Sequence, residues 1–145
     1  MKILRIDHIG INVNDLGAAK AFFLALGLKI QGKGKVQGEW VDRIVGLRGV
    51  KSSLIMLATP DGGTNIELVK LHTPTDKKGV QRSLANALGI RHITFVVEEV
   101  EAVVAELKKK GAKLVGEIVN YKDVYKVCYV RGPEGIILEL AEEIG

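Results

Sequence analysis

The stretch Ile6-Asp7-His8-Ile9 returns later in the chain as Ile90-Arg91-His92-Ile93. At the same offset, Gly27-Leu28-Lys29 returns as Gly111-Ala112-Lys113, so the register holds across the whole intervening stretch. Self-similarity at a fixed offset indicates an internal repeat. The sequence therefore predicts two copies of one structural module, each with a histidine near its start.

Each copy also ends in a glutamate framed by aliphatic residues. The first copy closes on Ile66-Glu67-Leu68 and the second on Leu138-Glu139-Leu140. A turn signal precedes each one, Pro60-Asp61-Gly62 in the first copy and Pro133-Glu134-Gly135 in the second. The repeat thus relates two histidines and two glutamates by pseudo-symmetry.

Hydrophobic periodicity predicts one strand, one helix and three further strands in each copy. Asp15 can cap the first helix, which ends at Gly27, and the second helix ends before Gly111. We expect a single α+β domain over 1–145, made of a first module (3–71), a polar connector (72–89) with a short helical turn over 81–88, and a second module (90–141). The strands are expected at 3–13, 28–36, 52–58, 64–71, 90–97, 113–119, 124–131 and 136–141.

The two-residue period of a strand decides where the histidines and glutamates point. His8 lies on the face opposite to Ile9 and Ile11, which the first helix is expected to cover. His92 shares its face with Thr94, and both glutamates point away from their aliphatic neighbours. The pattern predicts that all four side chains could converge on a cavity.

This order of elements resembles the vicinal oxygen chelate superfamily, which includes glyoxalase I, methylmalonyl-CoA epimerase, extradiol dioxygenases, fosfomycin-modifying thiol transferases and bleomycin-binding proteins. The resemblance runs from Ile6 to Ala141. Asp7–Leu16, followed by Phe22-Phe23 and Leu26–Leu28, is similar to the family's opening motif, and Arg131–Leu140 to its closing motif. It implies two βαβββ modules that form a cupped mixed sheet around one divalent metal, often in a homodimer.

The four repeated residues have the chemistry of a metal site. Two imidazoles and two carboxylates neutralise a divalent cation and leave two octahedral positions open. We expect nickel, cobalt, zinc or manganese as the cofactor, held by His8, Glu67, His92 and Glu139. The function expected is that of a glyoxalase I-type lyase or isomerase, with proton transfer through a metal-stabilised enediolate. Glu67 and Glu139 are the candidate bases, and Glu139, between aliphatics, is expected to be drier and more basic.

Other interpretations of these residues remain open. The histidines could be hydrogen-bonded core residues and the glutamates solvated, although their paired repetition favours a metal site. Extradiol dioxygenases and thiol transferases use three ligands, two histidines and one glutamate, at positions that correspond to His8, His92 and Glu139. A glutamate at position 67 as well therefore favours four-ligand chemistry. Epimerases usually place a catalytic glutamate where this chain has Leu47. A metal-free module that binds a cationic drug is the alternative of a different class, and 5% aromatic residues with a net charge of +4 suit it poorly.

The substrate is a small molecule whose identity the sequence leaves open. Glutathione-binding glyoxalases usually carry an arginine where this chain has Asn12. The candidate substrate-binding residues are Asn12, Trp40, Arg43, Tyr121 and Tyr125; the competing interpretation is a surface arginine and aromatic rings that cover the core.

Composition excludes several function classes. The chain has 21 basic and 17 acidic residues, and its lysines are scattered with few aromatics among them, so nucleic acid is not an expected partner. The lone Cys128 rules out an internal disulfide and lies in an apolar run typical of a buried thiol. No apolar stretch approaches the length of a membrane span. We expect a cytoplasmic protein without membrane partners, with His72 on its surface.

Overall fold

The computed structural model describes residues 2–145 of the chain. The chain divides into two compact units, the first ending at Gly79 and the second beginning at Val80. This division falls inside the predicted connector, 72–89. Among residues 2–145, no helix is both long and apolar enough to cross a membrane.

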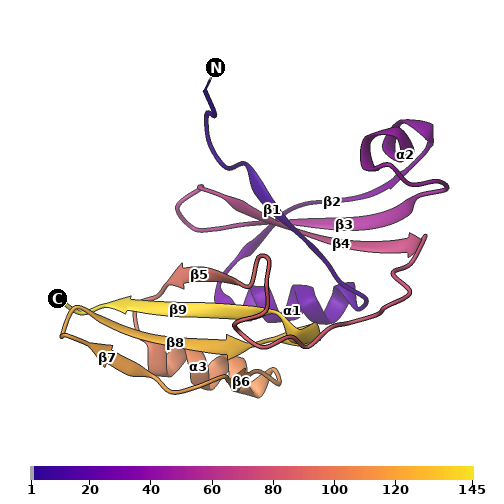
Figure 1. Ribbon diagram of the computed structural model, residues 1–145. Coiled ribbons are helices and arrows are strands. Elements are labelled where there is room, and N and C mark those ends of the chain that lie inside the picture. Colours follow the sequence, from indigo (N-terminus) through magenta and orange to yellow (C-terminus); the bar gives the residue numbers. More distant parts are fainter. Residues whose placement is uncertain (1) are drawn as a thin grey trace. The chain divides into compact units, whose positions relative to one another are not determined.

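The first unit contains one mixed sheet of four strands. Its elements in chain order are β1 (His8–Asn12), α1 (Leu16–Leu26), β2 (Lys29–Gln37), α2 (Glu39–Val45), β3 (Lys51–Ala58) and β4 (Asn65–Thr73) (Figure 1). The spatial order is β1-β4-β3-β2. β1 runs parallel to β4, whereas β4, β3 and β2 are antiparallel neighbours.

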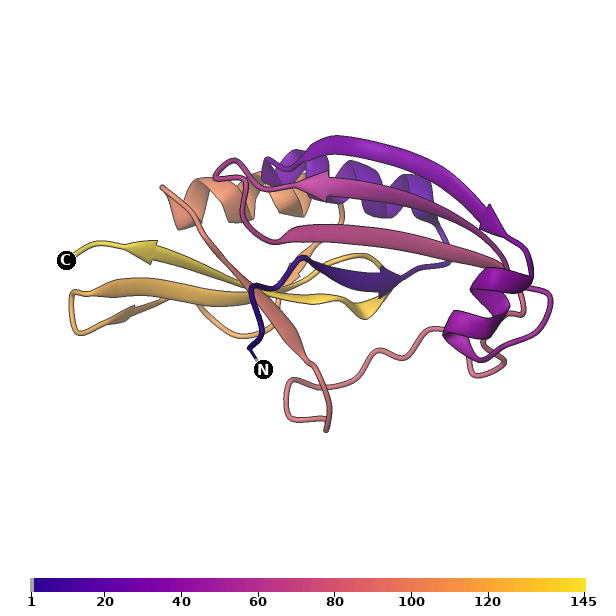
Figure 2. The same ribbon diagram turned by 90° about the horizontal axis from the view of Figure 1, so that it is seen from above.

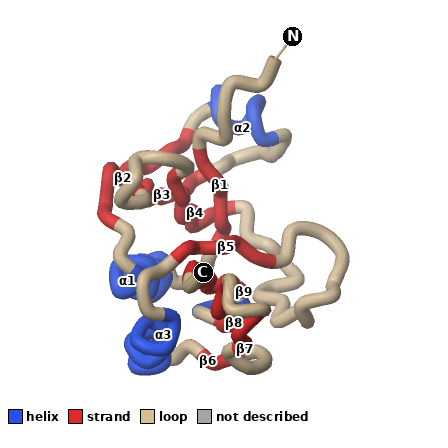
Figure 3. The backbone as a smooth tube through the Cα atoms, turned by 90° about the vertical axis from the view of Figure 1, so that its left-hand side faces the viewer, coloured by secondary structure: helices blue, strands red, loops and turns tan. Residues whose placement is uncertain are grey.

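The second unit repeats this plan. It contains β5 (His92–Val96), α3 (Val100–Lys109), β6 (Lys113–Leu114), β7 (Val119–Tyr121), β8 (Tyr125–Arg131), a 3-10 turn (Pro133–Gly135) and β9 (Ile137–Glu143). The order is β5-β9-β8-β6, with β7 also paired to β8, and the β5–β9 pair is again parallel. α3 contacts β6, β8 and β9 (Figure 3). The predicted α+β class and the two-module plan are confirmed.

Helix α1 covers one face of the first sheet, where it contacts β3 and β4 (Figure 2). The side chain of Asp15 accepts a hydrogen bond from the Ala18 amide at 2.9 Å, as its predicted capping role requires. Gly27 ends the helix in the left-handed conformation with φ 115°, which glycine adopts without steric cost. The side chains of Phe22 and Phe23, both on this helix, are buried. Their rings are in edge-to-face contact, with centroids 5.5 Å apart.

Truncation of this aromatic pair is expected to destabilise the protein strongly. Phe23 is fully buried, so Phe23→Ala removes apolar contacts and leaves a cavity that the surrounding core cannot fill completely. We expect a loss of about 3–5 kcal/mol in the free energy of unfolding. Urea denaturation measures this loss directly. Leu24→Ala, on the exposed side of the same helix, is the matched control, and an equal loss in both variants would contradict the assigned packing.

Three predicted strands are shortened by three or more residues or divided, whereas the bounds of the other five agree within two residues. The strand expected at 3–13 is confined to His8–Asn12, because its partner β4 begins at Asn65, which pairs with His8. In the described part of the chain, residues 2–6 pair with no strand of this unit, and Ile3 and Leu4 are largely exposed. The strand expected at 90–97 shortens to His92–Val96. The strand expected at 113–119 separates into β6 and β7.

Two helical segments also differ from the prediction. Helix α2 was not predicted; it follows Gly38 at φ 125°, carries Glu39 and Asp42 in its first turn, and buries only Val41. So short a segment with one buried residue has little of the apolar periodicity from which helices are predicted. The helical turn expected over 81–88 reduces to a single turn, which the Ala87 amide closes on the Leu84 carbonyl at 3.0 Å.

Cys128 is buried in β8, as predicted. Burial raises the pKa of its thiol, so the folded protein keeps the thiol protonated at pH values where an unfolded chain has begun to form thiolate. The folded state therefore binds this proton more tightly than the unfolded state does. The resulting stability is present below the unfolded-state pKa and is lost as the pH rises through the folded-state pKa.

The chemical consequence of this burial is slow alkylation. Because the thiolate is the nucleophile, we expect Cys128 to resist iodoacetamide at pH 8 in the native protein and to react fully in denaturant. Mass spectrometry of the labelled protein distinguishes the two states. Stoichiometric labelling of the folded protein within minutes would contradict the observed burial.

Candidate functional site

The first half of the candidate site lies on the edge pair β1 and β4. Gly10 pairs with Glu67 and His8 with Asn65, so these residues share one face of the sheet. Nε2 of His8 lies 3.9 Å from Oε1 of Glu67. A Cβ atom at Gly10 would also lie 3.9 Å from that oxygen, so the glycine leaves the carboxylate open on this side.

The apolar partners occupy the opposite face of the same strands. Ile9 pairs with Ile66, and Ile11 pairs with Leu68. Ile66 and Leu68 are buried on the side that α1 covers. The helix therefore lies on the side of Ile66 and Leu68 of β4, and His8 and Glu67 lie on the other face of the sheet.

The second half repeats the arrangement on β5 and β9. Thr94 pairs with Glu139 in the parallel register that places Gly10 beside Glu67 in the first unit. Nε2 of His92 lies 3.3 Å from Oε2 of Glu139. The Thr94 hydroxyl donates to the same carboxylate oxygen at 3.1 Å. Each unit thus brings one predicted histidine and one predicted glutamate together.

A second group holds the other ring nitrogen of each histidine. Nδ1 of His8 lies 2.8 Å from Oδ2 of Asp7, and Nδ1 of His92 lies 3.2 Å from the Tyr129 hydroxyl. The rings of His92 and Tyr129 are also in contact, with centroids 4.9 Å apart. Histidines that ligate metals almost always have their second nitrogen hydrogen-bonded in this way, which fixes the tautomer and the ring orientation.

Electrostatics couple Asp7 and His8. The hydrogen bond to Asp7 raises the pKa of His8 in the metal-free protein. The pKa of Asp7 is lowered, first by the hydrogen bond to His8 and then by that from Arg5, whose Nη2 lies 3.2 Å from Oδ1. Asp7 therefore stays ionised at neutral pH and accepts a hydrogen bond from Nδ1–H of His8, which leaves Nε2 of neutral His8 with a free lone pair.

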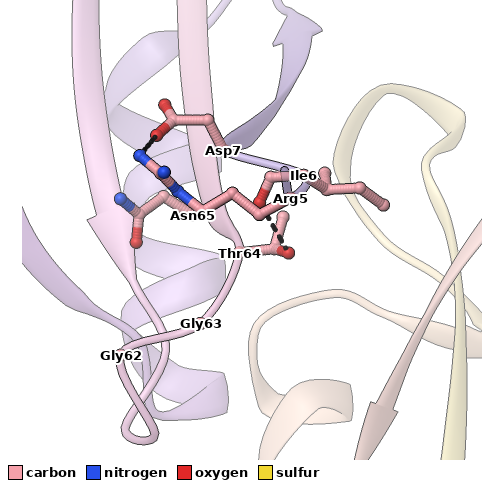
Figure 4. A pocket seen from close by; sticks show the side chains of 7 residues that line it. All are labelled: Arg5, Ile6, Asp7, Gly62, Gly63, Thr64 and Asn65. Atoms are coloured by element: carbon pink, nitrogen blue, oxygen red, sulfur yellow. Dashed lines mark hydrogen bonds and ion pairs between the residues drawn. The ribbon is translucent and has the colours of Figure 1, made fainter. Parts of the chain in front are cut away.

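An open pocket adjoins this half of the site. It has a volume of about 440 Å³ and is lined by Arg5, Ile6, Asp7, Gly62, Gly63, Thr64 and Asn65. Figure 4 shows the Arg5 guanidinium reaching Asp7, and the Thr64 hydroxyl donating to the Ile6 carbonyl at 3.2 Å. The carboxylate that holds His8 therefore also lines a space large enough for a small molecule.

The expectation that Glu139 is the drier carboxylate is wrong. The side chains of Glu67 and Glu139 are 23% and 24% exposed. The aliphatic neighbours of Glu139 point to the other face of β9, so they do not shield it from water. The two glutamates differ in hydrogen bonding instead. Within residues 2–145, the Glu139 carboxylate accepts a hydrogen bond from Thr94, whereas the polar side-chain partner of the Glu67 carboxylate is His8 alone.

The donor set fits a divalent transition metal. Imidazole nitrogen together with carboxylate oxygen suits nickel, cobalt, zinc and manganese. Within either unit, considering residues 2–145, no group of three or more histidine, cysteine or acidic side chains gathers at metal-binding distance. Each unit therefore supplies one imidazole and one carboxylate, which is half of the predicted ligand set.

The remaining predicted residues lie elsewhere in their units. Asn12 is at the end of β1, on the face of His8. Trp40 and Arg43 lie on α2, after the end of β2 that pairs with Lys51. Glu67 pairs with Met56, about 17 Å further along β3, so the first unit does not place α2 beside the His8–Glu67 pair.

The two predicted tyrosines form a cross-strand pair. Tyr121 pairs with Tyr125 in the β7–β8 hairpin. Tyr125 precedes Tyr129 by four residues, or about 13 Å along the strand, so neither tyrosine meets His92. Trp40, Tyr121 and Tyr125 are all exposed, so none of these rings covers the core.

Comparisons with known proteins agree with this architecture. The family model described as Glyoxalase/Bleomycin resistance protein/Dioxygenase superfamily matches residues 5–140. The uncharacterized protein YwbC of Bacillus subtilis (strain 168) is 30% identical over 138 residues, which cover 93% of this chain and 94% of YwbC. The uncharacterized protein YaeR of Escherichia coli (strain K12) is 26% identical over 142 residues, 96% of each chain.

Solved structures extend the likeness to three dimensions. The crystal structure of a glyoxalase family protein from Bacillus cereus is 42% identical with a TM-score of 0.96, and the match covers 100% of this chain and 97% of that one. The fosfomycin resistance protein FosX from Listeria monocytogenes, at 20% identity and a TM-score of 0.64 over 99% and 95% of the two chains, shares the fold. The chain belongs to the Glyoxalase/Bleomycin resistance protein/Dioxygenase superfamily, the family that its sequence resembles.

Proposed function

We propose that this chain is a metal-dependent lyase or isomerase of the glyoxalase I type, which moves a proton between carbons of a small oxygenated substrate. One observation carries the proposal. In both units, a histidine on an edge strand directs Nε2 at a glutamate of the parallel neighbour, while a separate group holds Nδ1. A histidine that serves only packing has no need of this geometry in both copies.

The ligands proposed for the metal are His8, Glu67, His92 and Glu139. Such an ion, when bound, supplies a Lewis acid that stabilises negative charge developing on substrate oxygen. Asp7 and Tyr129 orient the two imidazoles. Each unit contributes one histidine and one glutamate to this proposed ligand set.

We assign the proton-accepting role to Glu139. A general base must first be positioned, and Thr94 orients the Glu139 carboxylate through a hydrogen bond of 3.1 Å. Glu67 is equally exposed, but within residues 2–145 it has no such hydrogen-bond donor. We therefore assign it the role of metal ligand alone, and it is the reference against which Glu139 is tested. The pocket beside Asp7 has room for a small substrate.

The decisive experiment measures metal binding and proton exchange together. Chelator-treated protein is reloaded with nickel, cobalt, zinc or manganese, and calorimetry records affinity and stoichiometry. A panel of α-oxoaldehydes, with and without added thiols, is then followed in deuterium oxide by NMR. We expect stoichiometric binding and deuterium incorporation at a substrate carbon. Weak binding of all four metals would favour a metal-free binding module, for which the exposed ring of Trp40 is the supporting feature.

The hydrogen-bond partners of the two histidine Nδ1 atoms, Asp7 and Tyr129, provide a separate test. Removal of the hydrogen-bond partner of a ligating histidine typically costs about 10–100-fold in metal affinity. We therefore expect Asp7→Ala and Tyr129→Phe each to weaken metal binding within that range, measured by competition with a chromophoric chelator. Tyr125→Phe is the control. It removes a tyrosine hydroxyl from the same strand at a position away from His92, so it should leave the metal affinity unchanged. Equal affinities for the parent, Asp7→Ala and Tyr129→Phe would contradict the assigned roles.

A further inference from the structure

A second pocket lies at the far end of the first sheet. It has a volume of about 180 Å³ and is lined by Lys35, Val36, Gln37, Lys51, Ser52, Ser53 and His72, from three adjacent strands. His72 follows Asn65, the partner of His8, by seven residues of β4, or about 23 Å. The pocket is thus separate from the His8–Glu67 pair, and it contains the one histidine that the repeat leaves without a counterpart.

The formally charged groups of this pocket are all basic. Lys35 pairs with Ser53 across β2 and β3, and Lys51 lies two residues before Ser53, so both lysines share one face as diagonal neighbours. Among residues 2–145, neither ammonium group has a carboxylate within 4.0 Å. Two uncompensated cations beside a concave surface produce a local positive potential that attracts anions.

Ser53 and His72 add a further hydrogen-bond donor to this pocket. The Ser53 hydroxyl and Nε2 of His72 lie 2.8 Å apart. A hydroxyl and an imidazole carry at least two polar protons between them, and their mutual hydrogen bond uses one of them. In either tautomer the pair retains one donor for a third group. A ligand with several acceptor oxygens would meet two ammonium groups and this donor, all on rigid strands.

We propose that this pocket binds a tetrahedral oxyanion, namely phosphate or the phosphoryl group of a small phosphomonoester. The pocket volume equals several water molecules at roughly 30 Å³ each, which suits a phosphoryl group with part of its hydration shell. Lysine is a compact point charge that binds phosphate oxygens without requiring a planar partner. The site is independent of the proposed function, because none of its lining residues belongs to the candidate metal site.

The full chain, labelled with ¹⁵N, is titrated with inorganic phosphate at constant ionic strength, with sodium chloride as the reference salt. We expect saturable shifts at the amides of Ser53 and His72 that chloride does not produce. The double substitution Lys35→Met and Lys51→Met should raise the phosphate Kd about tenfold or more, since it removes two charge-assisted contacts. Lys2→Met with Lys29→Met removes the same charge; Lys29 is about 20 Å from Lys35 along β2, so this control should retain the parent Kd.

A second titration with glycerol 2-phosphate distinguishes the two sources of the anion. Tighter binding than inorganic phosphate identifies a phosphomonoester as the ligand, and weaker binding identifies free phosphate; both support the site. Equal Kd values in the Lys35/Lys51 double variant and the Lys2/Lys29 control would overturn it, as would identical shifts with chloride. If the Lys35/Lys51 variant unfolds, the single substitutions Lys35→Gln and Lys51→Gln should each still weaken binding about threefold.

Discussion

Replacement of His92 or His8 by alanine is expected to remove most of the affinity for divalent metal. Each substitution deletes a ring nitrogen that faces a glutamate, at 3.3 Å in the second unit and 3.9 Å in the first. Within residues 2–145, no further histidine or cysteine joins either histidine–glutamate pair. The loss should exceed the roughly 10–100-fold that follows removal of a group hydrogen-bonded to a ligand, because the ligand itself is lost. Calorimetric titration of the chelator-treated variants measures the effect.

The third histidine provides the matched control. His72 is paired with Ser53 in the basic pocket, away from both glutamates, so His72→Ala should bind metal as tightly as the parent. All three variants should keep the thermal stability of the metal-free parent within a small margin, since each of these histidines is exposed. Equal metal affinities in all three variants would show that the repeated histidines do not form a metal site.

Much of the fold and of the candidate site could be predicted because the sequence contains an internal repeat. Repetition of the histidine and glutamate positions identified the two strands of each pair, and alternation with Ile9 and Ile11 predicted the face on which His8 lies. These features depend on local periodicity, which is readable without the tertiary structure.

The partners of the histidines could not be predicted in the same way. Asp7 precedes the first residue of β1, so strand alternation does not govern its side chain, and the second copy has Arg91 at that position. Tyr129 belongs to β8 and reaches His92 because it pairs with Glu139 across β8 and β9. That register depends on long-range strand pairing. The unpredicted helix α2 likewise has too short an apolar pattern to be recognised.

Glu139→Gln is expected to reduce proton transfer far more than Glu67→Gln, even under conditions in which both variants are saturated with metal. The two carboxylates are almost equally exposed, so burial does not distinguish them. Orientation does, because Thr94 donates a hydrogen bond to Glu139, whereas no side chain among residues 2–145 donates one to Glu67 in this way. A positioned general base typically contributes about 10²–10⁴-fold, and an amide at position 139 keeps the shape while it loses the basic oxygen.

Exchange of substrate hydrogen for solvent deuterium reports this step directly, whether or not product accumulates. Thr94→Val separates orientation from basicity: it keeps the carboxylate and removes its donor, so exchange should fall by less than in Glu139→Gln. Thr73→Val, at the far end of β4 where Thr73 pairs with Lys51, is the control and should leave exchange unaffected. Equal exchange in Glu139→Gln and the parent would exclude Glu139 as the base. A large loss in Glu67→Gln alone would transfer the role to Glu67, because a carboxylate free of hydrogen bonds would then be the one that moves to the substrate carbon.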